Sequence, residues 1–367
     1  MLSPKDKQDK LIRATDLDAL SCRHNINSRS YLIPSDIYIS KLIDSYHQNL
    51  QYCYGYTNLS SSRALRLFND RKLPLINRGT YLRTIAIDNI VHGFIEEFGK
   101  CQIVSLGSGS DTRAFSILNK YSEVIYHEID FPESVKIKKL AIYSDNELQK
   151  IVGLESKQVP VINSRDTFVE FDCDLQTSRY HLHGIDIRTW KDLKTPFAHF
   201  DQNLPTLVIS ECVLCYLSPD EYENTINYLT AISNNLISFV IYEPMSLNDS
   251  FGLTMTKNLL DRGLNLMTFN KYPDLQSRRE FLAQNCKLTN LRLTDMSNVG
   301  GYSKNSQGDK QPWVELDTLK RINSLEFIDE IEEIKLLLEH YCLIYGDFNR
   351  KSSERFSGID KWSWVVT

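Results

Sequence analysis

Short apolar runs alternate with longer segments of helical periodicity from about residue 80 onwards. The apolar runs have the length and the continuous hydrophobicity of strands that are buried on both faces of a sheet. The segments between them, such as 133–142 and 220–234, are long enough to form helices. This alternation predicts right-handed βαβ crossovers and an open, mostly parallel sheet. The predicted strands are 101–106, 124–129, 180–185, 206–209, 239–242, 288–293 and 340–345.

Local signals predict where several of these elements begin. The 220–234 helix follows SPDE, residues 218–221, which combines an N-cap serine, a proline at the first helical position and two acids in the first turn. A further helix is expected over 324–338. Its short connection to 340–345 predicts a final antiparallel hairpin or edge pair.

Three parts are expected along the chain. The first 78 residues mix polar and apolar positions with helical spacing and contain no glycine-rich turn, so we expect a helical cap or lid over 1–78. An α/β core is expected over 79–350 and a C-terminal tail over 351–367. Residues 301–312 have the composition of a surface loop.

Composition and charge exclude several classes of protein. The chain has 367 residues, 42% of them hydrophobic and 24% charged, which is typical of a globular protein with a substantial core. A net charge of −5 gives no overall basic field for nucleic acid or for an anionic membrane surface. No apolar run reaches the roughly 20 residues of a spanning helix, and the polar N-terminus lacks the apolar segment of a signal peptide. We therefore expect a cytoplasmic protein that binds neither nucleic acid nor membrane.

Cysteines and histidines do not predict a metal site. The eight cysteines are scattered along the chain and are expected to be free thiols in a reducing compartment. Cys212 and Cys215 form a CxxC, but a structural zinc site needs a second pair of ligands at similar spacing. His181 and His183 share one face of a predicted strand, with no third ligand evident nearby.

The segment LGSGSD, residues 106–111, follows the first predicted strand. In an open parallel sheet, ligands bind beyond the carboxyl ends of the strands, where a glycine turn lets them approach the backbone closely. A dinucleotide site needs a third glycine in the pattern GxGxxG, and Thr112 stands at that position. Taken alone, these two glycines fit a structural turn and a cofactor turn equally well.

Three acids follow the later strands and change that balance. Asp130 ends the second strand, at about the distance from Gly107 where an acid accepts hydrogen bonds from ribose hydroxyls. Asp186 ends the third strand, where it can meet an adenine amino group, and Glu211 follows the fourth. The set suits a ligand with a ribose, an adenine and an ammonium group but little phosphate. S-adenosylmethionine, which is positively charged and has no pyrophosphate, is such a ligand.

Six stretches of the chain then resemble the leucine carboxyl methyltransferases, in their fungal form. They are TDLDALSCR, NRGTYLRT, IVSLGSGSDTRAF, YHEIDFPESV, ISECVLCYL and LEFIDEIEEIKLLLEHY, in the expected order from about Asp16 to Tyr345. NRGTYLRT together with ISECVLCYLSP is the specific combination. The resemblance implies a class I, Rossmann-like methyltransferase with a seven-stranded, mostly parallel sheet, a helical N-terminal cap and S-adenosylmethionine as its cofactor.

The resemblance also implies a substrate and a set of contacts. The family methylates the α-carboxylate of the C-terminal leucine of type 2A protein phosphatase catalytic subunits, and we expect a monomer that recognises this tail. The segment between Asn119 and Tyr180 is longer and more polar than the core requires, so no residue is carried over there. In some members a lysine of the N-terminal segment reaches the cofactor, and its best match here is Arg29, in a region that departs from the pattern. The remaining implied cofactor contacts are Arg83, Gly107, Asp130, Asp186, Ile187 and Glu211.

The expected chemistry needs no general base. A carboxylate is ionised at neutral pH, so the enzyme has to align it with the S–CH3 bond and remove part of its water. Arg83 is the candidate for holding a carboxylate in its planar fork, either that of the substrate or that of the cofactor. Tyr81 and Tyr216 are candidates for hydrogen-bond donors or pocket walls, with core aromatics as the alternative. Glu211 is expected to meet the cofactor's ammonium.

Other functions are weighed against this one. A wybutosine-type tRNA carboxyl methyltransferase acts on a hypermodified guanosine, but such enzymes carry a long C-terminal repeat region that we do not expect here. A non-catalytic module that binds the phosphatase tail conflicts with the intact set of Arg83, Gly107, Asp130 and Glu211. An NAD-dependent oxidoreductase is disfavoured by the missing third glycine.

Overall fold

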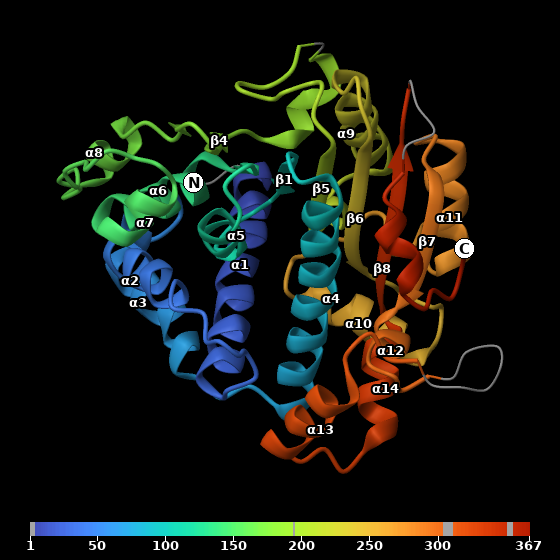
Figure 1. Cartoon of the computed structure of the whole chain (residues 1–367). Helices are drawn as coiled ribbons and strands as arrows, with labels where there is room; N and C mark the ends of the chain where they lie inside the picture. The colour runs from blue at the N-terminus through green and yellow to red at the C-terminus, as the bar shows by residue number, and fades with distance from the viewer. Residues whose placement is uncertain (1–3, 194, 304–310, 351–354) are drawn as a thin grey trace. The chain divides into compact units, whose positions relative to one another are not determined.

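The computed structural model describes residues 4–193, 195–303, 311–350 and 355–367 (Figure 1). The chain forms two compact units. Unit 1 combines Met1–Lys72 with Ser105–Ile187, and unit 2 combines Leu73–Val104 with Arg188–Thr367. Each unit is therefore built from two stretches that are separate in the sequence.

Unit 1 begins with helices, as its polar and apolar spacing predicts. These are α1 (Pro4–Ser28), α2 (Ile39–Asn49) and α3 (Asn58–Ala64), with 3-10 turns at Leu50–Tyr52 and Leu65–Asn69. The longer, more polar region between Asn119 and Tyr180 includes two short helices, Asn146–Ile151 and Arg165–Glu170. The second stretch contains α5 (Arg113–Lys120), β2 (Ile125–Asp130), α6 (Pro132–Ser144), α7 (Asn146–Ile151), α8 (Arg165–Glu170), β3 (Leu175–Gln176) and β4 (Tyr180–Gly184).

The two stretches of unit 1 share one apolar core. Leu17 of α1 and Leu42 of α2 belong to the same buried cluster as Ile137 and Leu140 of α6. Helix α6 begins at Pro132, whose fixed φ suits the first helical position, and Glu133 complements the helix dipole there. The N-terminal helices are thus held by burial of apolar surface against a segment far along the chain.

The strands β2 and β4 of unit 1 end at the same edge of the sheet. β2 pairs in parallel with β4, with Asp130 opposite Gly184, and β3 pairs antiparallel with β4. β1 (Gln102–Leu106) carries the chain from unit 2 into unit 1. Because β2 and β4 are parallel, Asp130 and the residues after Gly184 lie at the same edge.

Unit 2 contains the long helix α4 (Pro74–Phe98), which begins with a proline at its first position and ends at Gly99. After α4, the described part of the chain forms 3-10 turns at Ile187–Asp192, Leu214–Tyr216 and Ser357–Lys361. The other elements are β5 (Thr206–Glu211), α9 (Pro219–Ile232), β6 (Ile237–Pro244), α10 (Ser250–Asp261), α11 (Leu275–Gln284), β7 (Thr289–Asp295), α12 (Met296–Val299), α13 (Leu316–Leu325), α14 (Ile331–Glu339) and β8 (Tyr341–Phe348).

The strands of unit 2 confirm two expectations. β5 and β6 are parallel, and all residues of β6 are buried, as its continuous apolar run predicts. β8 pairs antiparallel with both β6 and β7, which confirms an antiparallel C-terminal pair (Figure 1). The strand order is β3-β4-β2-β1-β5-β6-β8-β7. The α/β class is confirmed, with eight strands in place of the expected seven, because the two-residue β3 adds one.

The predicted start of α9 is confirmed in detail. Ser218 Oγ accepts a hydrogen bond from the backbone N–H of Glu221 at 3.2 Å, and the Glu221 carboxylate accepts one from the Ser218 N–H at 2.8 Å. These two bonds satisfy backbone donors that the first turn of a helix leaves unpaired.

The helix predicted over 324–338 is wrong in its first part, and α14 confirms the rest. The chain forms α13 and α14 instead, separated by residues 326–330. Arg78 of α4 donates to the Ile322 carbonyl at 2.9 Å, and Asn77 donates to the Glu326 carboxylate at 2.7 Å. These contacts engage the end of α13 with side chains of α4, so a helical pattern that is continuous in sequence is interrupted by tertiary bonds.

Two further expectations are only partly covered. Residues 304–310 of the expected loop over 301–312 lie outside the described residues, as do 351–354 of the expected tail. The division into a cap over 1–78, a core over 79–350 and a tail over 351–367 stays a prediction. Among the described helices, none has both the length and the apolar character needed to cross a membrane.

Candidate active site

The glycine turn of unit 1 has the backbone that its sequence requires. Gly107 and Gly109 have φ of 54° and 43°, in the left-handed region that favours glycine. A Cβ at Gly109 would lie 2.2 Å from Oδ1 of Asp16, so any side chain there meets another residue. The turn ends at Arg113, where α5 begins.

Asp130, at the end of β2, binds the backbone of this turn. Its carboxylate accepts hydrogen bonds from the N–H of Gly109 at 2.7 Å and of Phe131 at 2.6 Å, one on each oxygen. Burial and the nearby Asp16 raise the pKa of Asp130 to about 6. Each carboxylate oxygen can accept a second hydrogen bond, so the group has acceptor sites for a pair of ribose hydroxyls. This donor and acceptor set fits the ribose of S-adenosylmethionine.

Asp16 of α1 binds this turn, and the sequence did not indicate it. It accepts hydrogen bonds from the backbone N–H of Ser110 at 2.7 Å and from its hydroxyl at 2.6 Å, and also from the Tyr46 hydroxyl. An acid beside Leu17 and Leu20, on the buried face of a helix, was the available signal. Acids that are partly buried need partners, and here they are Ser110 of the glycine turn and Tyr46 of α2.

Two arginines of the N-terminal segment have different surroundings. Arg23 contacts Asp36 at 3.2 Å and the Thr112 hydroxyl at 3.4 Å, so it lies beside the glycine turn. Arg29 bonds through Nε to the Asn25 side chain at 3.2 Å. The cofactor contact expected at Arg29 stays a prediction, and Arg23 is the basic side chain that the structure brings to Thr112.

The chain after β4 continues the same edge of unit 1. The N–H of Ile185 donates to the Asp130 carbonyl at 2.9 Å, which ties this segment to the end of β2. Asp186 follows it, half-buried, and Ile187 begins a 3-10 turn. The edge therefore carries Gly107, Asp130, Asp186 and Ile187, four of the five cofactor residues expected in unit 1; the fifth is Arg29.

Arg83 and Glu211 form an ion pair in unit 2. Glu211 ends β5 opposite Tyr242 of β6, and Arg83 of α4 pairs with the Glu211 carboxylate. The Arg83 guanidinium lies over the Tyr242 ring, 4.8 Å from its centre. Burial alone would lower the pKa of Arg83, but the Glu211 charge holds it above its ordinary value. Both side chains remain partly open to solvent.

The next residue, Cys212, has an unusual backbone. Its φ is 57°, rare for a residue with a side chain, and its N–H donates to the Tyr242 carbonyl at 2.8 Å. Burial raises the pKa of Cys212 to about 11, so the thiol is neutral at pH 7. All eight cysteines are free thiols. In the part of the chain described, no three His, Cys, Asp or Glu side chains are arranged to hold a metal ion.

The two candidate tyrosines lie in different surroundings. Tyr81 is buried and interacts with Arg321 of α13, and burial raises the pKa of its hydroxyl. Tyr216 is half-buried and packs with Cys212 against an apolar cluster. We call this the Tyr216 cluster; its buried members are Cys215, Leu266 and Phe269, and its partly buried members are Cys212, Tyr216, Met255 and Leu259.

Comparison with known proteins identifies the family. Residues 12–230 match the family model described as leucine carboxyl methyltransferase. Leucine carboxyl methyltransferase 1 of Candida albicans is 58% identical over 370 residues and that of Debaryomyces hansenii 52% over 373, each alignment covering 100% of both chains. The Bos taurus protein of that name is 31% identical and covers 94% of this chain and 92% of its own. A solved putative methyltransferase from Thermobifida fusca is 12% identical with a TM-score of 0.47, covering 86% of this chain and 97% of that one, too distant to add to the assignment.

The matched residues include the glycine turn, Asp130, Arg83 and Glu211. The protein is thus an enzyme that transfers a methyl group from S-adenosylmethionine to a carboxylate. The identity of the side chains that touch the cofactor stays a prediction. The matched model and the full-length relatives show that the chain belongs to the leucine carboxyl methyltransferase family.

Proposed function

We propose that the protein methylates the α-carboxylate of the C-terminal leucine of the type 2A protein phosphatase catalytic subunit, in the cytoplasm and as a monomer. The observation that carries the proposal is in unit 2. Arg83, a cation suited to a carboxylate, pairs with Glu211, and the neighbouring Cys212 belongs to the partly open Tyr216 cluster. A terminal leucine presents this combination of groups, a carboxylate beside a branched apolar side chain.

The reaction needs orientation more than acid or base catalysis. The bound cofactor supplies a methyl group on a positively charged sulfur. A substrate carboxylate oxygen forms the new O–C bond while the S–C bond breaks and its electron pair stays on sulfur, so no proton moves. The products are a methyl ester and S-adenosylhomocysteine.

Arg83 has the donors for this task. Its Nε is engaged by Glu211, and its two terminal nitrogens carry four more N–H groups in a fixed plane. A carboxylate that binds there through one oxygen keeps the other for attack. Glu211 limits the positive charge at this point, so the carboxylate is oriented without being held so tightly that it loses reactivity.

Leucine specificity is assigned to the Tyr216 cluster. Its partly buried members Met255 and Leu259 offer apolar surface for a leucine side chain. Burying such a side chain contributes about 1.5–3 kcal/mol. A terminal aspartate would lose this contribution and bring a second negative charge toward Glu211.

Transfer of a labelled methyl group tests the proposal. The purified chain is expected to label the phosphatase catalytic subunit, and a peptide of its C-terminal residues, in a base-labile ester. A peptide that ends in leucinamide is expected to stay unlabelled, because it has no terminal carboxylate. Labelling of transfer RNA instead, or binding of the tail without any transfer, would contradict the proposal.

A further inference from the structure

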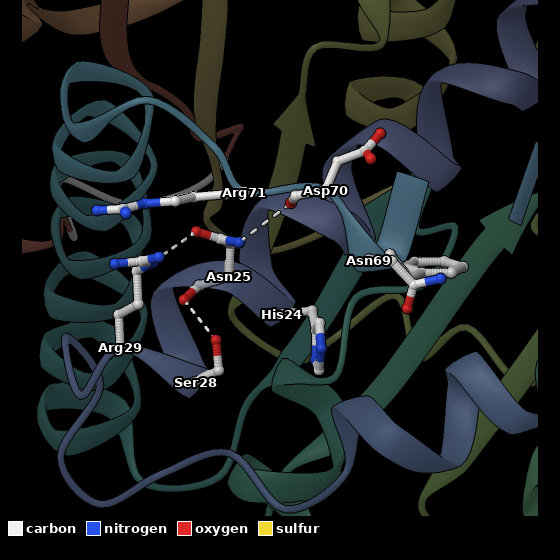
Figure 2. A pocket seen from close by; sticks show the side chains of 8 residues that line it. His24, Asn25, Ser28, Arg29, Asn69, Asp70 and Arg71 are labelled. Atoms are coloured by element: carbon white, nitrogen blue, oxygen red, sulfur yellow. Dashed lines mark hydrogen bonds between the residues drawn. The ribbon is translucent and has the colours of Figure 1, made fainter. Parts of the chain in front are cut away.

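A cavity of about 470 Å³ lies in unit 1 between the end of α1 and the residues that follow α3 (Figure 2). One wall is formed by the last turn of α1 and the residue after it, and the other by residues 68–71. Phe68 is buried beneath the second wall. The lining side chains are His24, Asn25, Ser28, Arg29, Phe68, Asn69, Asp70 and Arg71.

The side chains of this cavity are basic and polar. Arg29 and Arg71 contribute two positive charges, and His24 and Asn25 add polar side chains. Asp70 is the acid among the eight lining residues, and Figure 2 shows its carboxylate directed away from the two guanidinium groups. Such a local excess of positive charge contrasts with the net charge of −5 of the whole chain.

Asn25 fixes the two walls relative to each other. Its side-chain oxygen accepts a hydrogen bond from Nε of Arg29 at 3.2 Å, and its side-chain nitrogen donates to the Asp70 carbonyl at 3.3 Å. An arginine has five N–H donors, so a guanidinium that is already bonded still carries donors for a ligand. The cavity therefore holds hydrogen-bond donors and positive charges in fixed positions, which is typical of sites that bind oxyanions.

The C-terminus of α1 does not cancel this charge. Helix C-termini repel anions through unpaired carbonyl groups. Here the Asn25 carbonyl accepts from the N–H of Arg29 and the hydroxyl of Ser28, and the Ile26 carbonyl accepts from the N–H of Tyr31. The carbonyls are capped, and the arginine side chains outweigh the remaining partial charge.

The cavity faces away from the glycine turn. Asp16 and Arg23, seven residues apart, lie on the same face of α1 and both contact the turn. Arg29 comes six residues after Arg23, which rotates it by about 240° and advances it about 9 Å along the axis. A group bound at Arg29 is thus near the turn along α1 but on a different side of the helix.

We propose that this cavity is a docking site for an acidic side chain of the folded protein substrate, apart from the methylated end. The inference rests on the proposed function. A leucine tail alone buries little surface, whereas a specific protein complex buries roughly 1,200–2,000 Å². A carboxylate from the substrate surface matches the two guanidinium groups in charge and shape.

The test uses the full chain with Arg71→Gln, with Arg71→Glu as the charge reversal, and with Arg66→Gln as a matched control. Arg66 is an exposed arginine of the 3-10 turn Leu65–Asn69, which precedes Arg71, and it does not line the cavity. Two quantities are measured, the Kd for the phosphatase catalytic subunit by calorimetry and the KM for its C-terminal peptide. Arg71→Gln is expected to raise the Kd about threefold to tenfold and Arg71→Glu further, with the peptide KM unchanged.

The outcomes separate this inference from the proposed function. If the wild-type chain methylates neither substrate, the proposed function fails, and the Kd comparison still tests the cavity. Equal Kd values for Arg71→Gln, Arg71→Glu and Arg66→Gln would overturn the docking site. So would binding of inorganic phosphate that Arg71→Gln abolishes while the phosphatase Kd stays unchanged, because the cavity would then hold a small free anion.

Discussion

Two arginines of the NRGTYLRT motif, Arg78 and Arg83, have opposite surroundings on the same helix. Arg78 is buried, and its guanidinium bonds to the Tyr302 hydroxyl, the Asn323 side chain and the Ile322 carbonyl. Arg83 is partly open and pairs with Glu211 beside Tyr242. The sequence presents both as basic residues of one motif. Their partners show that the first ties α4 to α13, whereas the second belongs to an ion pair that is partly open to solvent.

Arg83→Lys is expected to fold normally and to lose roughly 10- to 100-fold in methyl transfer, because lysine keeps the charge but not the planar donors that align a carboxylate. Single-turnover kinetics and cofactor affinity are the measurements. If Arg83 orients the substrate, the loss appears in the transfer step. If it holds the cofactor's carboxylate, the Kd for S-adenosylmethionine rises and saturating cofactor restores much of the rate. Wild-type values for both would remove Arg83 from the site.

Asp130 predicts a pH dependence of cofactor binding. Its pKa of about 6 in the free protein means that the carboxylate, which is the better acceptor for ribose hydroxyls, is lost as the pH falls through 6. The Kd for S-adenosylmethionine is expected to be constant above pH 7 and about tenfold higher at pH 5.

The variants Asp130→Asn and Asp16→Asn check the source of this dependence by calorimetry. Asp130→Asn is expected to bind more weakly and to flatten the profile. Asp16→Asn removes a neighbouring negative charge that raises the pKa of Asp130, so it is expected to move the midpoint to lower pH. A profile of unchanged shape in Asp130→Asn would assign the titration to another group.

At the scale of elements, the strands follow from local pattern and one helix does not. The apolar run over 239–242 suffices to predict β6, because a strand buried on both faces needs no information beyond its own hydrophobicity. The break between α13 and α14 depends on Asn77 and Arg78, which lie far away in the sequence. For the same reason the ends of the predicted strands indicated Asp130 and Glu211, whereas the role of Asp16 depends on how α1 packs against the glycine turn.

The contact of α1 with the glycine turn makes Gly109→Ala a severe change. The added Cβ would lie 2.2 Å from Asp16 Oδ1, and the backbone would keep a φ of 43°. The free energy of unfolding is therefore expected to fall by about 2–4 kcal/mol, and cofactor binding is expected to weaken. Urea denaturation and calorimetry are the measurements.

Gly153→Ala is the matched control for this change. Gly153 is in the same unit and has a φ of 73°, but its nearest neighbour is the Ser178 hydroxyl at 3.3 Å. Gly153→Ala is expected to lower the free energy of unfolding by only about 1 kcal/mol and to leave the cofactor affinity unchanged. Combining Asp16→Ala with Gly109→Ala should cost less than the sum of the two single changes. If the loss of stability in the double variant equals the sum of the two single losses, the contact between Asp16 and the added Cβ is not the cause of the destabilisation.

The tie between α4 and α13 is expected to matter for stability alone. Arg78→Met keeps the length of the side chain but leaves the Ile322 carbonyl and the Asn323 side chain without this donor, at a cost of about 1.5–3 kcal/mol. The urea midpoint is expected to fall while the Kd for S-adenosylmethionine stays at its wild-type value. A raised Kd with unchanged stability would move Arg78 into the site.

At the scale of the whole molecule, ligand binding is expected to stabilise the fold by mass action. S-adenosylhomocysteine at about one hundred times its Kd adds about 2.7 kcal/mol, which raises the melting temperature. NAD at the same concentration is expected to have no effect, because Thr112 replaces the third glycine of a dinucleotide turn. A thermal shift with NAD equal to that with S-adenosylhomocysteine would contradict the cofactor assignment.

The division of unit 1 into two separate stretches has a consequence for synthesis on the ribosome. Asp16 binds Ser110, 94 residues later, and Leu17 and Leu42 share a core with Ile137 and Leu140. At about 5–20 residues per second, α1 is synthesised about 5 to 20 s before the residues that cover it. During that interval its apolar face is exposed to other proteins. We therefore expect the nascent chain to depend on ribosome-associated chaperones, and an N-terminal fragment that stops before residue 105 to aggregate.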